Sequence, residues 1–336
     1  MTATRDAWTR PGCFEVAPGV RRIVCPLPLD GLRAVNVYAI DDGDGVALID
    51  TGWNHPDIVA ALTAALGSFE RITAIICTHS HYDHYGLAGK LREWSGAPVL
   101  LGSEELPNLS GVLDAEGYER SSALARERMT LHGAGSLLAA SDGNYERVLA
   151  RGPWVLPDRV LADGERIELR TRVLEAKLTP GHTRGHLMFL DREAGLVFGG
   201  DHLLPHITPS LGFESFGDEQ ALERFLTSLA DIRDLPARHV LPGHGPVFDD
   251  LRGRVQELED HHIARLNACT DALDRPKTAF DVARALTWTR HERPFADLNR
   301  FNQMLAVSET ITHLELLADH GALRRERDGG LLLYGV

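Results

Sequence analysis

His79-Ser80-His81-Tyr82-Asp83-His84 places three imidazoles and one carboxylate within six consecutive residues. The stretch directly follows an apolar run, residues 72–77, which is short and rich in isoleucine and therefore predicts a buried β-strand. A cluster of His and Asp at a strand end can direct several nitrogen and oxygen donors at one point, as zinc or a similar metal requires. The alternative interpretation, a solvated His-rich loop, would not demand such a strand. The stretch therefore predicts a metal site.

Further candidate ligands occur downstream, each after a predicted strand. The three segments are Thr179-Pro180-Gly181-His182-Thr183-Arg184-Gly185-His186 after residues 172–178, Gly199-Gly200-Asp201-His202 after residues 196–198, and Leu241-Pro242-Gly243-His244-Gly245 after residues 239–241. Glycines in all three allow close backbone approach and unusual dihedral angles. We expect these loops to meet the first cluster at one edge of the fold.

The combination HxHxDH, TPGHTxGH, GD and PGHG resembles the metallo-β-lactamase-fold superfamily of hydrolases, and most closely the branch of glyoxalase II-type thioesterases. The resemblance covers roughly residues 15 to 250. It implies that His79, His81 and His182 hold one metal ion, that Asp83, His84 and His244 hold a second, and that Asp201 bridges them. Position 83 is Asp, followed by His, as in the hydrolases that the motif resembles, whereas a Glu there would resemble a di-iron redox relative. The resemblance also implies that Asp50, after the predicted strand 46–49, supports a ligating His.

The donor types favour hydrolysis by two divalent metal ions. Imidazoles and carboxylates suit zinc, with iron or manganese as alternatives, and no Cys occupies a ligand position. Metal binding can lower the pKa of water from about 15.7 to about 7, so a metal-bound hydroxide is the expected nucleophile toward an ester-like carbonyl. The chain has no GxSxG motif for a serine nucleophile. We take Asp83 and His202 as candidate catalytic residues.

Composition narrows the partners and the compartment. The formal net charge of −13 opposes a polyanionic substrate such as RNA, so we expect a small acyl substrate and no nucleic acid. Four Cys without a CxxC pair indicate free thiols in a reducing compartment. Neither a signal peptide nor an apolar run of 18 residues is evident, which favours a cytoplasmic protein without membrane attachment. A homodimer is compatible with these features.

The order of predicted elements indicates an α/β protein, and the resemblance implies the four-layer αββα sandwich. We assign residues 1–250 to this catalytic domain, with an insertion at about residues 103–158. Long connections outside the core are often functional, so the insertion is a candidate lid or substrate wall. Its apolar residues could line an acyl groove: Leu124, Met129, Leu131, Leu137 and Trp154. The alternatives are a helical pair that covers the surface and a dimer contact.

Residues 251–336 predict a small helical domain. Helices are expected at 251–273, 279–287 and 301–318, followed by a hairpin of residues 322–327 and 331–336. This order resembles the winged-helix module in some members of the superfamily. The segment that would read DNA, residues 308–318, contains Glu309 and Glu315 but no Lys or Arg. Since phosphate contacts dominate nucleic-acid affinity, we expect a packing or dimerisation role and not DNA binding.

These observations predict a dinuclear metal-dependent hydrolase of a thioester, with a lactone as the second substrate class. The same two metals could serve a phosphodiesterase or endoribonuclease. A metal-stabilised binding protein without turnover is the alternative outside enzymology. The acyl group, the leaving group and the native metal are left open by the sequence.

Overall fold

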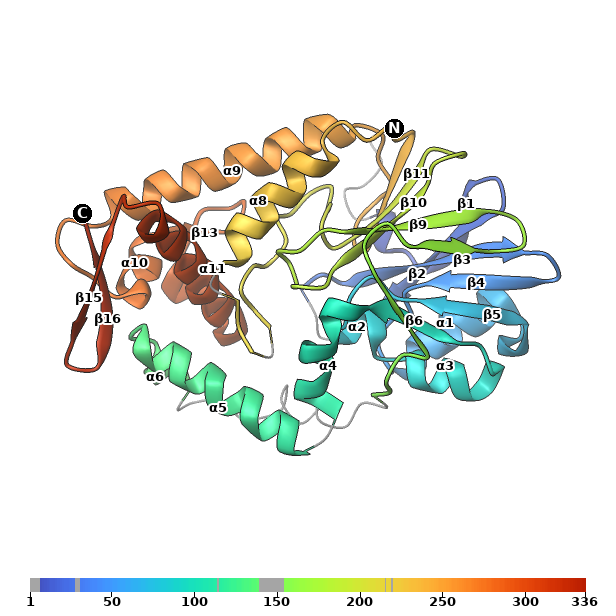
Figure 1. The fold of residues 1–336 in the computed structure, drawn as a ribbon, viewed down its shortest axis with the longest axis horizontal. Helices are drawn as coiled ribbons and strands as arrows, with labels where there is room; N and C mark the ends of the chain where they lie inside the picture. Colours follow the sequence, from blue (N-terminus) through green and yellow to red (C-terminus); the bar gives the residue numbers. More distant parts are fainter. Residues whose placement is uncertain (1–6, 28–30, 114, 139–153, 215, 219) are drawn as a thin grey trace.

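The fold is built from two β-sheets packed face to face, with helices on both outer surfaces (Figure 1). The computed structural model describes residues 7–27, 31–113, 115–138, 154–214, 216–218 and 220–336. Helices α1 and α3 cover one outer surface, α8 and α9 cover the other, and the C-terminal helices lie at the far end of the molecule (Figure 1). This is the αββα arrangement that the sequence predicted.

The first sheet has seven strands whose order in space is their order in the chain. They are β1 (Gly12–Ala17), β2 (Val20–Pro26), β3 (Ala34–Asp42), β4 (Gly45–Ile49), β5 (Ile72–Ile76), β6 (Val99–Gly102) and β7 (Arg159–Leu161). Neighbours from β1 to β4 are antiparallel, and those from β4 to β7 are parallel. The parallel pairs need crossovers, which α1 (Pro56–Leu66) supplies between β4 and β5, α3 (Ala88–Ser95) between β5 and β6, and the insertion between β6 and β7. Gly67, with φ +76°, ends α1 where the sequence predicted.

The second sheet has five strands in the order β12-β11-β10-β9-β8. They are β8 (Arg166–Glu168), β9 (Val173–Leu178), β10 (Leu187–Asp191), β11 (Leu196–Gly200) and β12 (His239–Pro242). Strands β11 and β12 are parallel and are connected through α8 (Ala221–Ile232). Their carboxyl ends therefore lie at the same edge of the sheet. Short 3-10 helices occur at Ala7–Thr9, Phe69–Arg71, Ser103–Glu105 and Phe295–Asp297.

Alternation along the strands separates the apolar layers. On β3, Val35 and Val37 face the core beneath α1 and α3, whereas Tyr38 and Ile40 face the core between the sheets. Phe198 of β11 meets Tyr38 edge-on with ring centroids 5.5 Å apart. A third apolar layer packs the outer face of the second sheet against α8 and α9. A one-residue shift in register would exchange these faces, so the apolar pattern fixes the pairing.

Helices α5 (Ala115–Leu131) and α6 (Gly135–Leu138) of the insertion share an apolar core with the C-terminal residues, whereas Leu109 of α4 (Leu106–Leu113) packs in the core beneath α1 and α3. Helix α9 (Leu251–Asp271) leads into the C-terminal unit, whose elements are α10 (Ala279–Ala285), β13 (Thr287–Trp288), β14 (Arg293–Pro294), α11 (Arg300–Asp319), β15 (Arg324–Asp328) and β16 (Leu331–Gly335). The predicted C-terminal helices and hairpin are thus present. Figure 1 shows α5 and α6 extending from the sandwich toward the terminal hairpin.

Two apolar side chains of the insertion do not line an acyl groove, contrary to our expectation. Met129 and Leu137 are buried in a core that they share with Ile311 and Leu314 of α11. They are buried because the amphipathic face of α5 and α6 has C-terminal helices to pack against. Residues 139–153 of the predicted insertion lie outside the described residues.

Helix α9 links the sandwich to the C-terminal unit. Val255 and Leu258, in its first half, pack with the core of α8, whereas Cys269, near its end, packs in the C-terminal core. The domain boundary after residue 250 stays a prediction. All four Cys are free. Among the described residues, no helix is both long enough and apolar enough to cross a membrane.

Asn36 of β3 joins the two sheets at the edge where the ligand loops meet. Its buried side chain donates hydrogen bonds to the carbonyls of Pro242 (2.8 Å) and Gly245 (2.9 Å). The backbone N–H of Asn36 also donates to Gly243 O at 2.7 Å. These bonds fix the loop after β12 against the first sheet.

We predict that Asn36→Ala lowers the free energy of unfolding by about 2–3 kcal/mol, because two buried carbonyls lose their donor. Denaturant titration measures this change as a lower midpoint at constant slope. Asn302→Ala, at an exposed position of α11, is the control and should change the free energy by less than about 0.5 kcal/mol. Equal stability of the two variants would contradict the proposed sheet-joining role of Asn36.

Candidate metal centre

The seven predicted ligands converge at one edge of the sandwich. His79 and His81 follow β5, and Asp83 and His84 lie on the short helix α2 (Tyr82–Tyr85). The other three follow strands of the second sheet: His182 after β9, Asp201 after β11 and His244 after β12. Leu187 N donates to Thr78 O at 2.8 Å and so holds the ends of the two sheets together beside the cluster.

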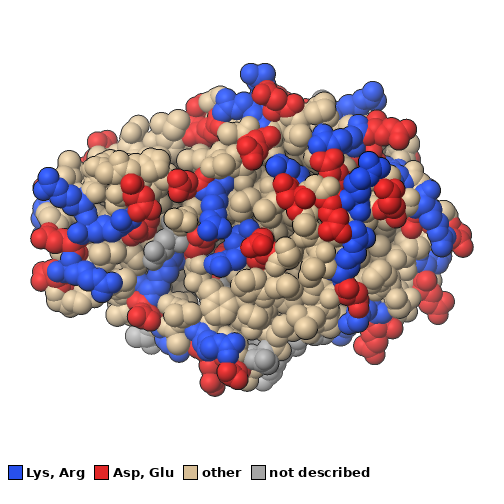
Figure 2. Space-filling model, viewed as in Figure 1, with Lys and Arg blue, Asp and Glu red and all other residues tan. Residues whose placement is uncertain are grey.

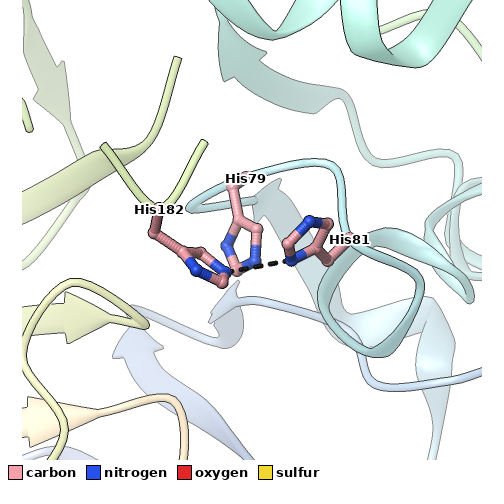
Figure 3. A group of neighbouring side chains, drawn as sticks. All are labelled: His79, His81 and His182. Atoms are coloured by element: carbon pink, nitrogen blue, oxygen red, sulfur yellow. Dashed lines mark hydrogen bonds between the residues drawn. The ribbon is translucent and has the colours of Figure 1, made fainter. Parts of the chain in front are cut away.

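His79, His81 and His182 form a first group, whose ligand atoms all lie within 4.8 Å of one another. Figure 3 shows the three rings turned toward a common point, with His81 Nδ1 and His182 Nε2 3.0 Å apart. His79 and His182 are buried, and His81 is half-buried. The group therefore offers three imidazole nitrogens at one edge of the protein interior.

Asp83, His84 and His244 form a second group with the same spacing. His244 Nε2 lies 3.2 Å from Asp83 Oδ2 and 3.4 Å from His84 Nε2. The Asp83 side chain is 19% exposed, whereas His84 is fully buried. This carboxylate is therefore the member of the second group that reaches solvent.

Asp201 lies between the two groups. Its Oδ1 is 3.4 Å from His84 Nε2, and its Oδ2 is 3.6 Å from His182 Nε2 and 3.5 Å from His244 Nε2. Its backbone N–H donates to His186 Nε2 at 3.1 Å. His186 is thus an acceptor that orients Asp201. Gly200, with φ +49°, leaves no room for a Cβ, which would lie 2.4 Å from His186 Nε2.

Hydrogen bonds on the outer side of the cluster orient His79 and His84. Asp50 Oδ2 accepts from His84 Nδ1 at 2.8 Å, which leaves His84 Nε2 facing the cluster. The Thr78 hydroxyl donates to Asp50 at 3.0 Å and lies 2.9 Å from His79 Nδ1. Asp50 adopts φ +62°, a left-handed conformation that Asp tolerates better than most residues. The carboxylate predicted to support a ligand therefore contacts His84 directly and His79 through Thr78.

Backbone carbonyls orient two further imidazoles in the same way. His182 Nδ1 donates to Ser210 O at 2.8 Å, and His244 Nδ1 donates to Ala34 O at 2.7 Å. In each case Nε2 is the ring nitrogen directed at the cluster. These partners assign the tautomers from the hydrogen-bond pattern.

The two groups differ in the charge that their imidazoles carry without a metal. Burial, together with neighbouring imidazoles, lowers the pKa of His79 and brings that of His182 to about 4. Burial also disfavours a proton on His244, but the carboxylates of Asp201 and Asp83 outweigh it and raise the pKa to about 10. The same carboxylates raise the pKa of His84 against the effect of burial. The imidazoles of the first group are therefore neutral at pH 7. Those of the second group, His84 and His244, are protonated beside the carboxylates of Asp83 and Asp201.

The arrangement fits a divalent metal ion. His79 Nε2 is buried and has no hydrogen-bond partner, although an unpaired buried polar atom is costly. His79, His84 and Asp201 also bring their ligand atoms within 4.8 Å of one another. Neutral imidazoles and carboxylates gathered at this spacing are the donors that zinc and related ions take.

The sequence suggested a catalytic role for His202 but gave no sign of a role for Glu105. His202 is fully buried against Phe225, with ring centroids 4.7 Å apart, and neither ring nitrogen has a hydrogen-bond partner. Its catalytic role stays a prediction.

Glu105, which the sequence reasoning did not select, is fully buried beside the ligand loops and accepts hydrogen bonds from two of them. Nothing in its Ser103-Glu104-Glu105 context distinguishes it from a surface acid.

Several curated proteins are similar to this chain over about 70% of its length. The lactamase-like protein adaB of Aspergillus niger is 25% identical over 73% of this chain, and the beta-lactamase-like protein 2 homolog of Caenorhabditis elegans is 28% identical over 70%. The atrochrysone carboxyl ACP thioesterase of Aspergillus fumigatus is 25% identical over 70%. The matches span only 61%, 63% and 58% of these three relatives.

Two solved structures are similar along nearly the whole chain. A metallo-beta-lactamase family protein of Thermus thermophilus is 31% identical, with a TM-score of 0.81 over 96% of this chain and 99% of that one. A beta-lactamase domain protein of Burkholderia ambifaria is 25% identical, with a TM-score of 0.77 over 97% and 96%. The family model described as the metallo-beta-lactamase superfamily matches residues 30–244, which include every predicted ligand. The chain thus belongs to the metallo-β-lactamase superfamily.

Proposed function

We propose that this protein is a dinuclear zinc hydrolase that cleaves an acyl thioester. The observation that carries the proposal is the position of Asp201, whose two oxygens lie within 3.6 Å of imidazole nitrogens from both groups. A carboxylate placed there can bridge two ions, one held by His79, His81 and His182 and the other by Asp83, His84 and His244. Zinc is the metal we propose because the first group consists of neutral imidazoles.

The residues of the chain would orient and activate the reactants. Two bound divalent ions supply Lewis acidity, which lowers the pKa of a coordinated water and polarises a carbonyl. Asp83 is anionic, because His84 and His244 lower its pKa against the effect of burial. Its partial exposure lets it accept a hydrogen bond from the attacking water. Asp201 is only 5% exposed and is therefore less accessible to a substrate than Asp83. No side-chain nucleophile is required.

A thioester is preferred to a phosphodiester because the ligand loops offer little free positive charge. Arg184, the cation nearest to His182 in the sequence, donates to Glu214 at 2.9 Å and to Gly217 O at 2.7 Å. On the face in Figure 2, acidic side chains lie beside the basic ones. One relative is named a thioesterase of a carrier-protein substrate, which favours the same chemistry here.

We propose that the C-terminal unit packs against the loops of the catalytic centre and does not bind DNA. The helix that would enter a DNA groove, α11, is buried at nearly every position from 306 to 316. Gly212, two residues after the carbonyl that orients His182, packs closely against Thr312 of α11. Arg128 of α5 donates to Gly212 O at 2.8 Å. The unit thereby supports the loop that holds a proposed ligand.

We expect Asp201→Asn to reduce the content of both ions, because one carboxylate balances charge on each. Its affinity loss should exceed the roughly 10–100-fold that a supporting residue contributes. Elemental analysis after dialysis should give about two ions per chain for the wild type and less than one for the variant. His202→Ala is the matched control, and it should keep both ions while turnover changes. Equal metal loss in the two variants would refute the bridging assignment.

The metal affinity of the second group should fall as pH falls, whereas that of the first group should not change. A metal must displace protons from His84 and His244, whose pKa values lie above their ordinary range, so affinity for this group falls as pH falls. The loss should be about tenfold per pH unit for each displaced proton. The first group has lowered pKa values, with that of His182 at about 4, and should keep its affinity between pH 8 and pH 5. Competition titrations with a chelator at pH 8, 7 and 6 test this, and parallel losses at both groups would contradict it.

The zinc-loaded protein should hydrolyse acyl thioesters with a turnover on the order of 1 s⁻¹ or faster. At matched enzyme concentration it should cleave little single-stranded RNA, because a nuclease needs a basic cleft and weakens steeply with salt. A thiol-release assay with acyl-CoA and acyl-carrier substrates, a lactone panel and labelled RNA distinguish the classes, with His81→Ala as the inactive control. RNA cleavage abolished by His81→Ala, without thioester or lactone turnover, would replace this proposal by the endoribonuclease alternative.

A further inference from the structure

Glu105 is a buried carboxylate that connects loops from both sheets. It lies just after β6, in the 3-10 helix Ser103–Glu105, and is 0% exposed. Oε2 accepts from the Ser80 backbone N–H at 3.0 Å and from the Ser80 hydroxyl. Oε1 accepts from the Gly185 backbone N–H at 3.1 Å and from the Thr183 hydroxyl. One oxygen therefore serves the loop after β5, and the other serves the loop after β9.

The residues that Glu105 contacts flank three proposed ligands. Ser80 separates His79 from His81, and Thr183 directly follows His182. All three imidazoles belong to the first group. Asp83, His84 and His244 of the second group make no hydrogen bond with Glu105 among those found in the described residues, and Asp50 and Ala34 O orient two of them instead. Glu105 is thus placed to act on one group selectively.

Only a carboxylate satisfies the four donors. An ionised carboxylate offers about four lone-pair sites and no donor, whereas a glutamine amide offers two acceptor sites and two N–H donors. A Gln side chain would therefore present its NH₂ to one loop, where the backbone N–H loses its acceptor and the hydroxyl has to accept instead of donate. The donors to Glu105 are all uncharged, and the nearby Arg184 is bonded to Glu214. A buried anion held only by neutral donors is costly to retain for stability alone.

Close backbone packing adds a second constraint at the same place. A Cβ on Gly185 would lie 2.3 Å from Glu105 N and 2.4 Å from Glu104 C. A Cβ on Gly102 would lie 2.6 Å from Gly185 O. The turn after β6 and the loop after β9 therefore touch through their backbones, and this contact brings Glu105 within reach of both loops.

We infer that Glu105 is a positioning residue that sets the separation of the His79–His81 loop from the His182 loop and so preorganises the first metal group. The inference rests on the proposed function only in that this group binds a metal. Because Glu105 contacts the loops and not the ligand atoms, its removal should loosen one ion and spare the other. Supporting residues of metal ligands typically contribute 10–100-fold in affinity.

Zinc competition against a chromophoric chelator, with the full-length protein, tests this inference. Glu105→Gln should weaken the ion of the first group by about 10–100-fold and leave the second group within about threefold. The Co²⁺-substituted protein should show altered d–d absorption for one of two ions. Thr183→Val keeps the side-chain volume and removes one donor, so it should weaken the same ion by only a few-fold. Thr183→Val also tests the inference if the Glu105→Gln variant fails to fold.

Glu315→Gln is the matched control for loss of a buried carboxylate. Glu315 lies on α11, is 6% exposed, and accepts from Arg325 and from the Tyr334 hydroxyl. It should lower stability without changing either zinc affinity or the Co²⁺ spectrum. Unchanged zinc binding in both Glu105→Gln and Thr183→Val, or equal weakening of both ions, would overturn the positioning role alone. Failure of the wild type to bind any ion would instead overturn the proposed function.

Discussion

The need to neutralise Asp201 and Asp83 inside the protein constrains the architecture around the metal centre. Two carboxylates 5% and 19% exposed cannot keep their charges there without positive partners at short distance. The metal-free protein provides protons on His84 and His244, and divalent ions would take over that role. Because His84 lies on α2, after the first sheet's β5, and His244 follows β12 of the second sheet, the charge balance requires both sheet ends to be held in one place. The inter-sheet bonds of Asn36 and Leu187 meet that requirement.

Each ligand then needs a fixed orientation, and the molecule supplies it in two ways. Asp50 and backbone carbonyls fix the rings of His84, His182 and His244 through Nδ1. Glu105 acts one level further out, on the loops that carry the rings. The difference is physical: a bond to the ring sets tautomer and basicity, whereas a bond to the loop sets only position. The first group has little carboxylate support at its rings and depends more on loop position.

The seven convergent residues could be named from the sequence because their short motifs resemble those of a known superfamily, and each motif follows a predicted strand. The helix at Pro56–Leu66 and the terminal hairpin were predictable from apolar periodicity and from Gly at their ends. Glu105 was not, because its function comes from burial between two loops about 100 residues apart in the chain. Met129 and Leu137 were assigned to a groove for the same reason: periodicity identifies an apolar face but not its partner.

The shared core of the insertion and α11 places the C-terminal unit against the loop that orients His182. The loop that orients His182 through Ser210 O is contacted by Arg128 of α5 and by Thr312 of α11. Phe213 in that loop also meets Phe301 edge-on at 5.5 Å. Most residues of α11 from 306 to 316 are buried in this packing. The packing continues the support of the ligands outward, from the His182 ring to its carbonyl partner and then to two helices.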